Sequence, residues 1–349
     1  MKKILAMFLV IAMVMGLLLL TGCGEAKTDE TAATEATGAS ETAAASDTTL
    51  ALVVAGTFGD RSFYDSSKEG ADRLAQDLGI KVNYIECNND SHTTQMQNAA
   101  DKADIVVLVG WEFYEVNVVA PQYPDVKFIW IDNATEQPVA NLLNITYAQN
   151  EGSFLAGYIA AAMSKSGVVG AVGGEDSDTI NDFIVGYEQG AEYYETESGK
   201  AISVVSNYTN SYDDPTTGKN CAIALYEQGA DVIFQIASAA GDGVFETAKE
   251  KGIYAIGVDS DQKYIDENVI ICSMKKEVGN SIYEAVKKFL EGDTSLLGTT
   301  WIADMATGYV GIGYGEEGSA QQIPDELKAT VEALAAKIVS GEIIVNTTR

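Results

Sequence analysis

The chain has 349 residues and is strongly acidic, with 51 Asp and Glu side chains against 22 Lys and Arg and a formal net charge of −29 at pH 7. Such a surface repels nucleic acid and anionic lipid headgroups, so neither is expected as a partner. Beyond the N-terminal segment only Cys87, Cys221 and Cys272 remain. Their odd number and wide spacing form neither a disulfide framework nor a metal-binding pattern. The sequence therefore predicts no metal site and no cofactor.

The N-terminus has the pattern of a bacterial lipoprotein signal. Two lysines precede an apolar run from Ile4 to Leu20, as in a secretory signal peptide. The run is short for a membrane-spanning helix, and no comparable run follows. The sequence L-T-G-C at residues 20–23 resembles a lipobox, in which the cysteine becomes the first mature residue and carries lipid. We expect residues 1–22 to be removed and lipid on Cys23 to hold the protein at the extracytoplasmic face of the cell membrane; the alternative is an ordinary signal or anchor with a chance cysteine.

Residues 23–49 are expected to form a flexible linker behind that anchor. From residue 24 to residue 49 the chain contains no Val, Ile, Leu, Met, Phe, Trp or Tyr. This stretch therefore cannot bury enough apolar surface to offset the entropy lost on ordering it. The body that follows, residues 50–349, is long enough for two domains of ordinary size.

From Leu50 onward, apolar runs rich in Val and Ile alternate with helical patterns. The runs expected to form strands are, in chain order, residues 50–55, 81–87, 104–110, 126–132, 167–174, 202–208, 231–237, 254–259 and 268–274. The helical patterns between them include residues 66–79, 151–167, 179–195, 218–229 and 243–252. Continuous apolar strands separated by helices indicate parallel strands that are buried on both faces. The sequence thus predicts a doubly wound α/β architecture.

Polar and aromatic side chains recur just beyond the expected strands. In a doubly wound fold, ligands bind at the carboxyl ends of the parallel strands. We therefore expect ten residues at these positions to form one ligand-binding site: Asp60, Ser62, Phe63, Tyr64, Trp111, Asp132, Tyr212, Ser238, Asp259 and Lys276.

Eight short motifs occur between about Leu50 and the final helix: GDRSFYDSSKEG, EGSFLAGYIAA, VGAVGG, DPTTGK, ALYEQGADVIFQ, GVF, AIGVDSDQ and CSMKK. In order and spacing they resemble the basic membrane protein, or PnrA-like, family of substrate-binding lipoproteins of ABC importers, several of which take purine nucleosides. The resemblance implies a type I periplasmic-binding-protein fold, with two α/β lobes, three hinge crossings and a ligand held between the lobes. On that pattern the first lobe comprises residues 50–147 with about 259–292, and the second comprises residues 148–258 with about 293–349.

The resemblance also implies roles for the polar site residues. Asp259 and Lys276 match family residues that bind ribose hydroxyls, and Asp132 matches one that reads the edge of the base. Asp60 matches the acidic residue of the family's first loop, and Ser238 stands near a glycine pair of the family. An ionised carboxylate only accepts hydrogen bonds, which suits hydroxyl donors. The alternative for each aspartate is a helix N-cap, which loops between strands and helices favour.

Flat bases gain free energy by stacking on aromatic rings. Tyr212 in S-Y-D-D-P matches one family ring, whereas a second family ring falls at Lys68. Phe63, Tyr64 or Trp111 would have to replace that second ring. The alternative role for such rings is packing beneath a loop.

These features predict a protein that captures a nucleoside, with purine preferred, and hands it to the permease and ATPase subunits of an ABC transporter. More acidic than basic side chains surround the expected cleft, and desolvating a phosphate beside carboxylates is costly. A nucleoside is therefore expected rather than a nucleotide. A sugar receptor of the same fold would need similar rings and carboxylates, and a ligand sensor would have the same sequence features.

An enzyme is the remaining alternative, and it has little support. The single histidine, His92, lies in the polar stretch NNDSHTTQ without a nucleophile motif. The glycine-rich stretches VVGAVGG and GYVGIGYGEEG match neither phosphate-binding fingerprint. The sequence therefore predicts no catalytic residues.

Overall fold

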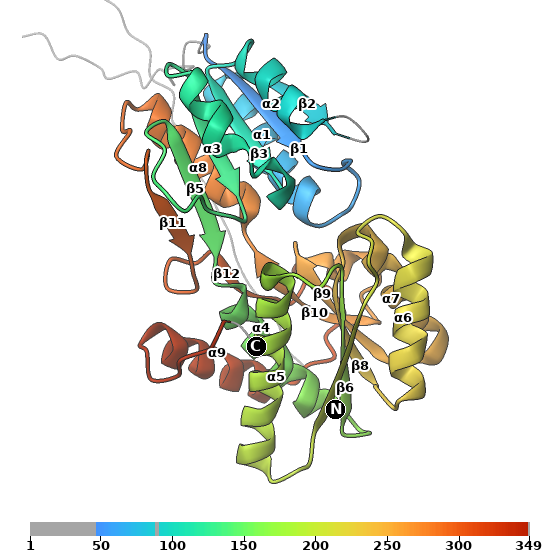
Figure 1. Ribbon diagram of the computed structural model, residues 1–349. Helices are drawn as coiled ribbons and strands as arrows, with labels where there is room; N and C mark the ends of the chain where they lie inside the picture. The colour runs from blue at the N-terminus through green and yellow to red at the C-terminus, as the bar shows by residue number, and fades with distance from the viewer. Residues whose placement is uncertain (1–46, 88–90, 348–349) are drawn as a thin grey trace, which may run out of the picture. The chain divides into compact units, whose positions relative to one another are not determined.

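The computed structural model describes residues 47–87 and 91–347. The expected signal segment, Cys23 and the linker up to residue 46 lie outside the described residues. Across the part of the chain that is described, no helix is long and apolar enough to cross a membrane. The described chain forms two α/β lobes, each built on a six-stranded sheet of its own (Figure 1).

The first lobe has a sheet with strand order β11-β5-β4-β3-β1-β2, in which every pairing is parallel. Its strands are β1 (Thr49–Val54), β2 (Lys81–Glu86), β3 (Ile105–Val109), β4 (Lys127–Ile131), β5 (Leu142–Tyr147) and β11 (Thr300–Ala303). Its helices are α1 (Phe63–Leu78), α2 (His92–Ala100), α3 (Val116–Val119) and α8 (Val278–Leu290), with short 3-10 helices at Trp111–Phe113 and Ala120–Gln122. The run IVVLV in β3 is buried throughout, as expected of a central parallel strand.

The second lobe has a sheet with strand order β12-β10-β9-β8-β6-β7, parallel except for the antiparallel pair β10 and β12. Its strands are β6 (Val168–Gly173), β7 (Ser203–Tyr208), β8 (Val232–Ile236), β9 (Tyr254–Asp259), β10 (Ile270–Lys276) and β12 (Val310–Gly313). Its helices are α4 (Gln149–Met163), α5 (Asp178–Ser198), α6 (Pro215–Glu227), α7 (Asp242–Lys251) and α9 (Asp325–Val339), with short 3-10 helices at Ser238–Gly241 and Gln262–Ile265.

All nine strands predicted from the sequence are present, and the doubly wound architecture is confirmed. The chain also crosses between the lobes three times: between β5 and α4, between β10 and α8, and between β11 and β12. Three strands of the described chain were not predicted. In β5 the polar residues Asn144 and Thr146 interrupt the apolar run, whereas β11 and β12 are four residues long and only partly buried. Short edge strands of this kind lack the continuous apolar run that marks the central ones.

The expected lobe boundaries are wrong in the C-terminal part of the chain. Within the segment 259–292, which was assigned to the first lobe, β10 pairs with β9 in the second sheet. Within the segment 293–349, assigned to the second lobe, β11 pairs with β5 in the first sheet. Of the returning chain, α8 does join the first lobe, where it lies beside α1 (Figure 1). The two helix backbones approach so closely that a Cβ on Gly70 would lie 2.3 Å from the carbonyl oxygen of Gly279.

The C-terminal segment is held to the second sheet by a buried lysine. Lys263 has no solvent exposure, and its Nζ donates to the carbonyl oxygens of Glu267 and Ile270 at 3.0 and 2.7 Å. A further bond of 2.7 Å reaches the Oε1 of Gln322, in the segment before α9. Burial lowers the pKa of Lys263. The ammonium thus joins the local segment 263–270 to Gln322, which is distant in sequence.

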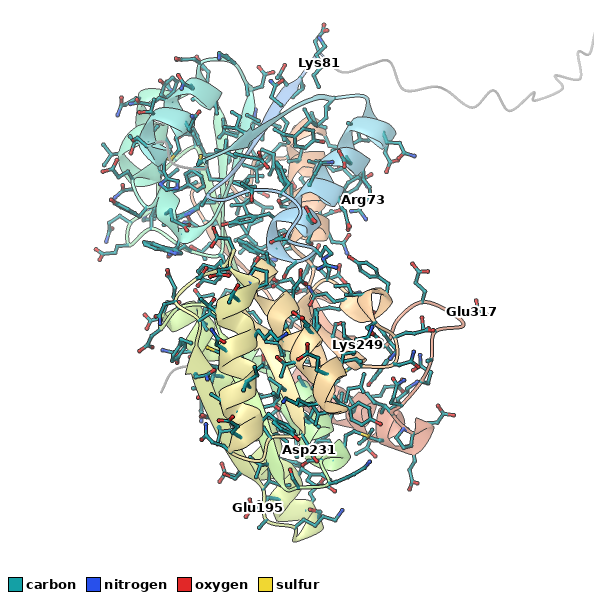
Figure 2. The ribbon with its side chains drawn as sticks, turned by 90° about the vertical axis from the view of Figure 1, so that its right-hand side faces the viewer. Arg73, Lys81, Glu195, Asp231, Lys249 and Glu317 are labelled. Carbon is teal, nitrogen blue, oxygen red and sulfur yellow. The ribbon has the colours of Figure 1, made fainter. Side chains whose placement is uncertain are left out.

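Replacing this lysine should destabilise the second lobe. Lys263→Met keeps the apolar stem but leaves buried carbonyl oxygens without a donor, so we expect the free energy of unfolding to fall by about 2–4 kcal/mol. Lys249→Met is the matched control, because the Lys249 side chain is 70% exposed and pairs with Asp266 at the surface (Figure 2). That change should cost less than about 1 kcal/mol. Equal urea midpoints for the two variants would refute the structural role of Lys263.

Candidate functional site

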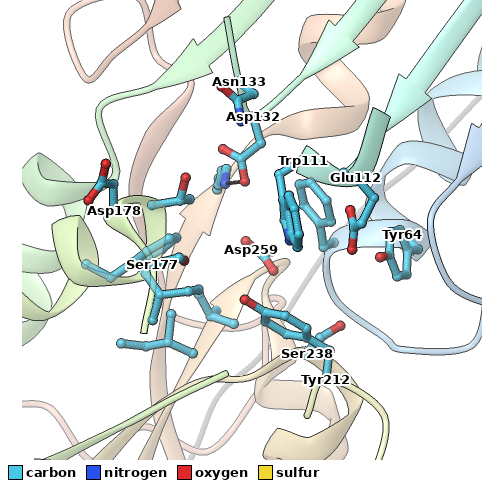
Figure 3. A pocket seen from close by; sticks show the side chains of 18 residues that line it. Tyr64, Trp111, Glu112, Asp132, Asn133, Ser177, Asp178, Tyr212, Ser238 and Asp259 are labelled. Carbon is cyan, nitrogen blue, oxygen red and sulfur yellow. Dashed lines mark hydrogen bonds and ion pairs between the residues drawn. The ribbon is translucent and has the colours of Figure 1, made fainter. Parts of the chain in front are cut away.

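A cavity of about 280 Å³ lies at the carboxyl ends of the strands of both sheets (Figure 3). From the first lobe it is lined by Phe63, Tyr64, Gly110, Trp111, Glu112, Asp132 and Asn133. From the second lobe it is lined by Ser177, Asp178, Thr179, Ile180, Phe183, Tyr212, Ile236, Ser238, Val258, Asp259 and Lys276. Both lobes therefore supply contacts to anything bound there, as the topological rule for such folds requires.

Eight of the ten residues predicted for the site line this cavity: Phe63, Tyr64, Trp111, Asp132, Tyr212, Ser238, Asp259 and Lys276. The other two, Asp60 and Ser62, lie behind its wall and are buried, with 4% and 0% exposure. They therefore shape the site from behind, and neither is placed to contact a guest in this arrangement.

Asp60 caps the first turn of α1. Its carboxylate accepts hydrogen bonds from the backbone N–H groups of Ser62, Tyr64 and Asp65 at 3.0–3.1 Å. A fourth bond, 2.7 Å long, comes from the hydroxyl of Ser238 in the second lobe. Burial raises the pKa of Asp60, while these donors oppose the rise. Asp60 thus acts as a helix cap, which was the alternative role for each aspartate, and the same carboxylate also links the lobes.

A buried ion pair crosses between the lobes at the centre of the cavity. The Nζ of Lys276, at the end of β10, lies 2.6 Å from the Oδ2 of Asp132, which follows β4. The Lys276 side chain is only 2% exposed. Its ammonium also lies 5.0–5.4 Å from the centres of the Phe63, Tyr147 and Phe183 rings. Three ring faces and one carboxylate therefore compensate this cation for lost hydration.

Asp259, at the end of β9, is the most perturbed acid of the cavity. It is 8% exposed, and burial raises its pKa to about 6 although Lys276 and a hydrogen bond from Ser62 oppose the rise. The Ser62 hydroxyl donates to its Oδ2 at 2.5 Å, again across the lobes. A carboxylate this poorly solvated gains strongly from hydroxyl donors on a guest.

Backbone strain is concentrated around the cavity. Among the described residues, five non-glycine residues have φ in the left-handed region, and three of them, Asp132 (73°), Ser238 (51°) and Asp259 (62°), line the cavity. Such residues persist where the surrounding structure enforces them, commonly at functional sites. Here the left-handed turn lets each side chain leave its strand end in the direction of the cleft.

The lining includes three aromatic side chains that are labelled in Figure 3, Tyr64, Trp111 and Tyr212. Trp111 is 49% exposed, which is unusual for an indole. Tyr212 lies against the backbone of Gly174, where a Cβ would be 2.0 Å from the ring. Lys68 lies elsewhere, paired with Asp72 at 2.6 Å on the surface of α1.

Comparison with known proteins gives the context for this geometry. Residues 47–349 match the model of the Bmp family, described as ABC transporter substrate-binding proteins, PnrA-like. The chain belongs to this family. It is 34% identical to Basic membrane protein A2 of Borrelia garinii subsp. bavariensis over 302 residues, covering 85% of this chain and 87% of the relative. It is 35% identical to Basic membrane protein D of Borreliella burgdorferi over 262 residues, covering 72% and 76%.

Solved structures support the same assignment. This PnrA-like chain superposes on an ABC transporter solute-binding protein from Aeropyrum pernix K1 with a TM-score of 0.79 and 28% identity, covering 86% of this chain and 94% of that one. A solute-binding protein from Conexibacter woesei superposes with a TM-score of 0.69 over 86% and 99%, and at 23% identity it shows the fold alone. The type I binding-protein fold is thus confirmed.

Sequence reasoning missed the segment that begins α5. In this PnrA-like protein Ser177, Asp178, Thr179 and Ile180 all line the cavity. The same rule that selected the other strand ends applies here, because these residues follow β6. Glu112 and Asn133 were also missed, although each directly follows a residue that was predicted. The end of β6 thus carried the same signal as the other strand ends, although no site residue was predicted there.

The first-lobe loop at residues 60–62 makes most of the polar contacts between the lobes. Besides the bonds of Asp60 and Ser62, Arg61 forms an ion pair with Asp242 at the start of α7. Gln262 donates from its Nε2 to the Arg61 carbonyl oxygen at 3.0 Å. These contacts fix the lobes in a closed arrangement, in which the guest would be surrounded.

Two further features concern the described part of the protein, its metal-ligating side chains and its single histidine. No group of three or more His, Cys, Asp and Glu side chains there could hold a metal ion. His92 does not line the cavity and instead stacks edge-on against Phe113, with ring centres 5.2 Å apart. Members of the family are substrate-binding components of transporters.

The raised pKa of Asp259 predicts a pH-dependent cost in stability. The folded protein holds this proton up to about pH 6, whereas the unfolded chain releases it near its ordinary value of 3.8. Stability from this group is therefore lost as pH rises from about 4 to about 6. Asp259→Asn, which tolerates the left-handed backbone, should raise the free energy of unfolding by up to about 3 kcal/mol at pH 7 and by little at pH 4.

The control is Asp125→Asn, at an exposed carboxylate. It should change the free energy of unfolding by less than about 0.5 kcal/mol at either pH. Urea unfolding at pH 4 and pH 7 measures both variants against the wild type. A stability gain for Asp259→Asn that is equal at the two pH values would contradict the titration argument.

Proposed function

We propose that this PnrA-like protein captures a nucleoside, with purine preferred, and delivers it to an ABC transporter. The observation that carries the proposal is that one cavity is lined both by aromatic rings and by charged hydrogen-bonding groups. The rings include Tyr64, Trp111 and Tyr212, and the charged groups include Asp259 and the Lys276–Asp132 pair. A nucleoside offers a partner to each kind of group, because it has a flat base and a hydroxyl-bearing ribose.

The contacts favour a guest whose base lies against the rings and whose ribose lies against Asp259. A base between rings gains roughly 1–3 kcal/mol from stacking. Ribose hydroxyls can donate to the Asp259 carboxylate, whose desolvation is otherwise compensated only by Ser62 and Lys276. The cavity volume of about 280 Å³ suits a small guest.

The charges of the lining residues favour a neutral guest. Glu112, Asp132, Asp178 and Asp259 face the cavity, against the single cation Lys276, which is already paired. A phosphate group brought into this space would lose its hydration beside carboxylates. Nucleosides are therefore proposed in preference to nucleotides.

Calorimetric titration of the wild-type protein tests this function. The panel consists of adenosine, inosine, guanosine, cytidine and uridine, followed by ribose, galactose and a nucleoside monophosphate. We expect purine nucleosides to bind and the monophosphate to bind far more weakly. Binding of sugars alone would replace the nucleoside assignment by a sugar receptor.

The ring contacts give a sharper prediction. Tyr212→Ala removes a stacking surface and should weaken nucleoside binding by about 10- to 100-fold. Tyr226→Ala is the matched control, because Tyr226 lies on α6 and pairs with Lys251 outside the cavity. That variant should bind as the wild type does. Equal affinities for the two variants would remove stacking at Tyr212 from the proposal.

We further propose that lipid on Cys23 holds the protein at the extracytoplasmic face of the membrane. The L-T-G-C sequence supports this proposal. Cys23→Ala expressed in the native host should move the protein from the membrane fraction to the soluble extracytoplasmic fraction. Retention in the membrane fraction would contradict a lipid anchor. In the same host, loss of nucleoside uptake on deletion of the gene favours transport, and unchanged uptake favours a sensing role.

A further inference from the structure

The side chain of Glu112 has an unused acceptor beside two aromatic rings of the cavity. Glu112 lines the cavity between Tyr64 and Trp111 (Figure 3). Its Oε2 is buried and has no hydrogen-bond partner among the described residues. A buried carboxylate oxygen in this state bears the full cost of lost hydration. That cost calls for an explanation, since the other buried acids of the site have partners.

The carboxylate of Glu112 packs against the backbone of Gly110. Gly110, which also lines the cavity, has φ of 129°, and a Cβ there would lie 2.4 Å from the Glu112 Oε2. Its carbonyl oxygen is in turn fixed by the indole N–H of Trp130 at 2.8 Å. Any side chain at position 110 would displace the carboxylate. The buried Oε2 of Glu112 therefore lies against the backbone that follows β3, beside the cavity.

The electrostatic surroundings place Glu112 among the rings. Burial raises the pKa of Glu112; His92 opposes the rise, and Glu175 and Asp132 add to it. Conversely, the negative charge of Glu112 contributes to the raised pKa values of Tyr64 and Tyr212. Glu112 is thus close to Tyr64 and Tyr212, two of the rings that would hold the base.

An ionised carboxylate accepts hydrogen bonds and donates none. Two adjacent N–H donors on a flat edge satisfy both of its oxygens at once, as in pairs between carboxylates and guanidinium groups. Guanine presents such an edge, with its ring N1–H beside its exocyclic amino group. Adenine presents one amino donor beside a ring acceptor, which would face a carboxylate oxygen unfavourably. Hypoxanthine keeps the ring N–H but lacks the amino group.

We propose that Glu112 determines specificity in this site, by reading the base edge and selecting bases that present paired N–H donors, guanine above hypoxanthine and adenine. The assignment rests on the proposed nucleoside function. It adds a residue beyond Asp132, whose Oδ2 is already engaged by Lys276. Rotation of the flexible Glu112 side chain toward the guest would bring its unpaired oxygen to the donors.

The first measurement uses the wild-type protein and four ligands: guanosine, inosine, 1-methylguanosine and adenosine. Inosine lacks the amino donor, and 1-methylguanosine lacks the ring N–H. Each missing bond to the carboxylate should weaken binding by roughly 10- to 100-fold relative to guanosine. This series needs no variant, so it stands even if a substitution at position 112 impairs folding.

The second measurement uses Glu112→Gln, an isosteric change that supplies one acceptor and one donor. Guanosine affinity should fall by roughly 10- to 100-fold, while adenosine affinity should hold or rise, because the amide can pair with its amino group and ring acceptor. The matched control is Glu115→Gln, which removes a nearby charge from a residue bonded to Thr93 outside the cavity. It should leave the preference among nucleosides unchanged.

The outcomes separate the two proposals. Nucleoside binding in which guanosine and inosine are equal, or in which Glu112→Gln weakens all nucleosides alike, overturns the role of Glu112 and leaves the nucleoside function standing. Absence of binding to every nucleoside overturns the proposed function itself. Reversal of the guanosine and adenosine preference in Glu112→Gln, with the melting temperature maintained, supports the specificity assignment.

Discussion

The ion pair between Lys276 and Asp132 is the interaction on which the arrangement of the site depends. Each partner comes from a different lobe, and the lysine is almost fully buried. A buried cation must find compensation, and here it lies between an opposing carboxylate and three ring faces. Because β10 ends at Lys276 and the chain then crosses to α8, the pair lies beside a hinge. Opening the cleft would separate the charges, so closure and the electrostatics of the cavity are coupled.

The loop at residues 60–62 makes a second set of contacts that depends on closure of the lobes. Asp60 satisfies the first turn of α1 and accepts from Ser238 across the cleft, while Ser62 donates to Asp259. A single short segment therefore determines where α1 begins and how the opposite lobe meets it. Residues that never touch the guest can change its affinity through such contacts, because ligand binding draws on the free energy of closure.

Most of the fold could be predicted from the sequence, because buried parallel strands require continuous apolar runs, and nine of the twelve strands in the described chain have such a run. The rule that ligands bind at the carboxyl ends of parallel strands likewise selected Asp259 and Lys276, and both line the cavity. The division of the C-terminal part was not predictable in this way. Whether β10 or β11 joins a given sheet depends on which neighbour offers an unpaired edge, and on the close contact of Gly70 with Gly279. Both are features of the tertiary structure that leave no pattern in the local sequence.

Tertiary contacts also explain why some site residues were not predicted and why others have a different role from the one predicted. Asp60 occupies a strand-end position, yet its carboxylate turns back to cap α1, which only the backbone path decides. Glu112 sits next to Trp111 in sequence, and its importance appears only once its unpaired oxygen and the space over Gly110 are seen. Position along the chain identifies candidates, whereas hydrogen-bond partners decide which carboxylates are already committed.

The acidic character of the cavity connects these observations to selectivity. Burial raises the pKa of Asp259 to about 6 and Glu112 has an unpaired oxygen, so both carboxylates are incompletely compensated for lost hydration by the described residues. A guest rich in hydroxyl and N–H donors removes that penalty, and a guest that brings acceptors or negative charge increases it. The hydrogen-bond donors of the guest then determine how much its binding stabilises the closed arrangement of the lobes. In this view the same unsatisfied carboxylates that weaken the empty protein provide its discrimination among small molecules.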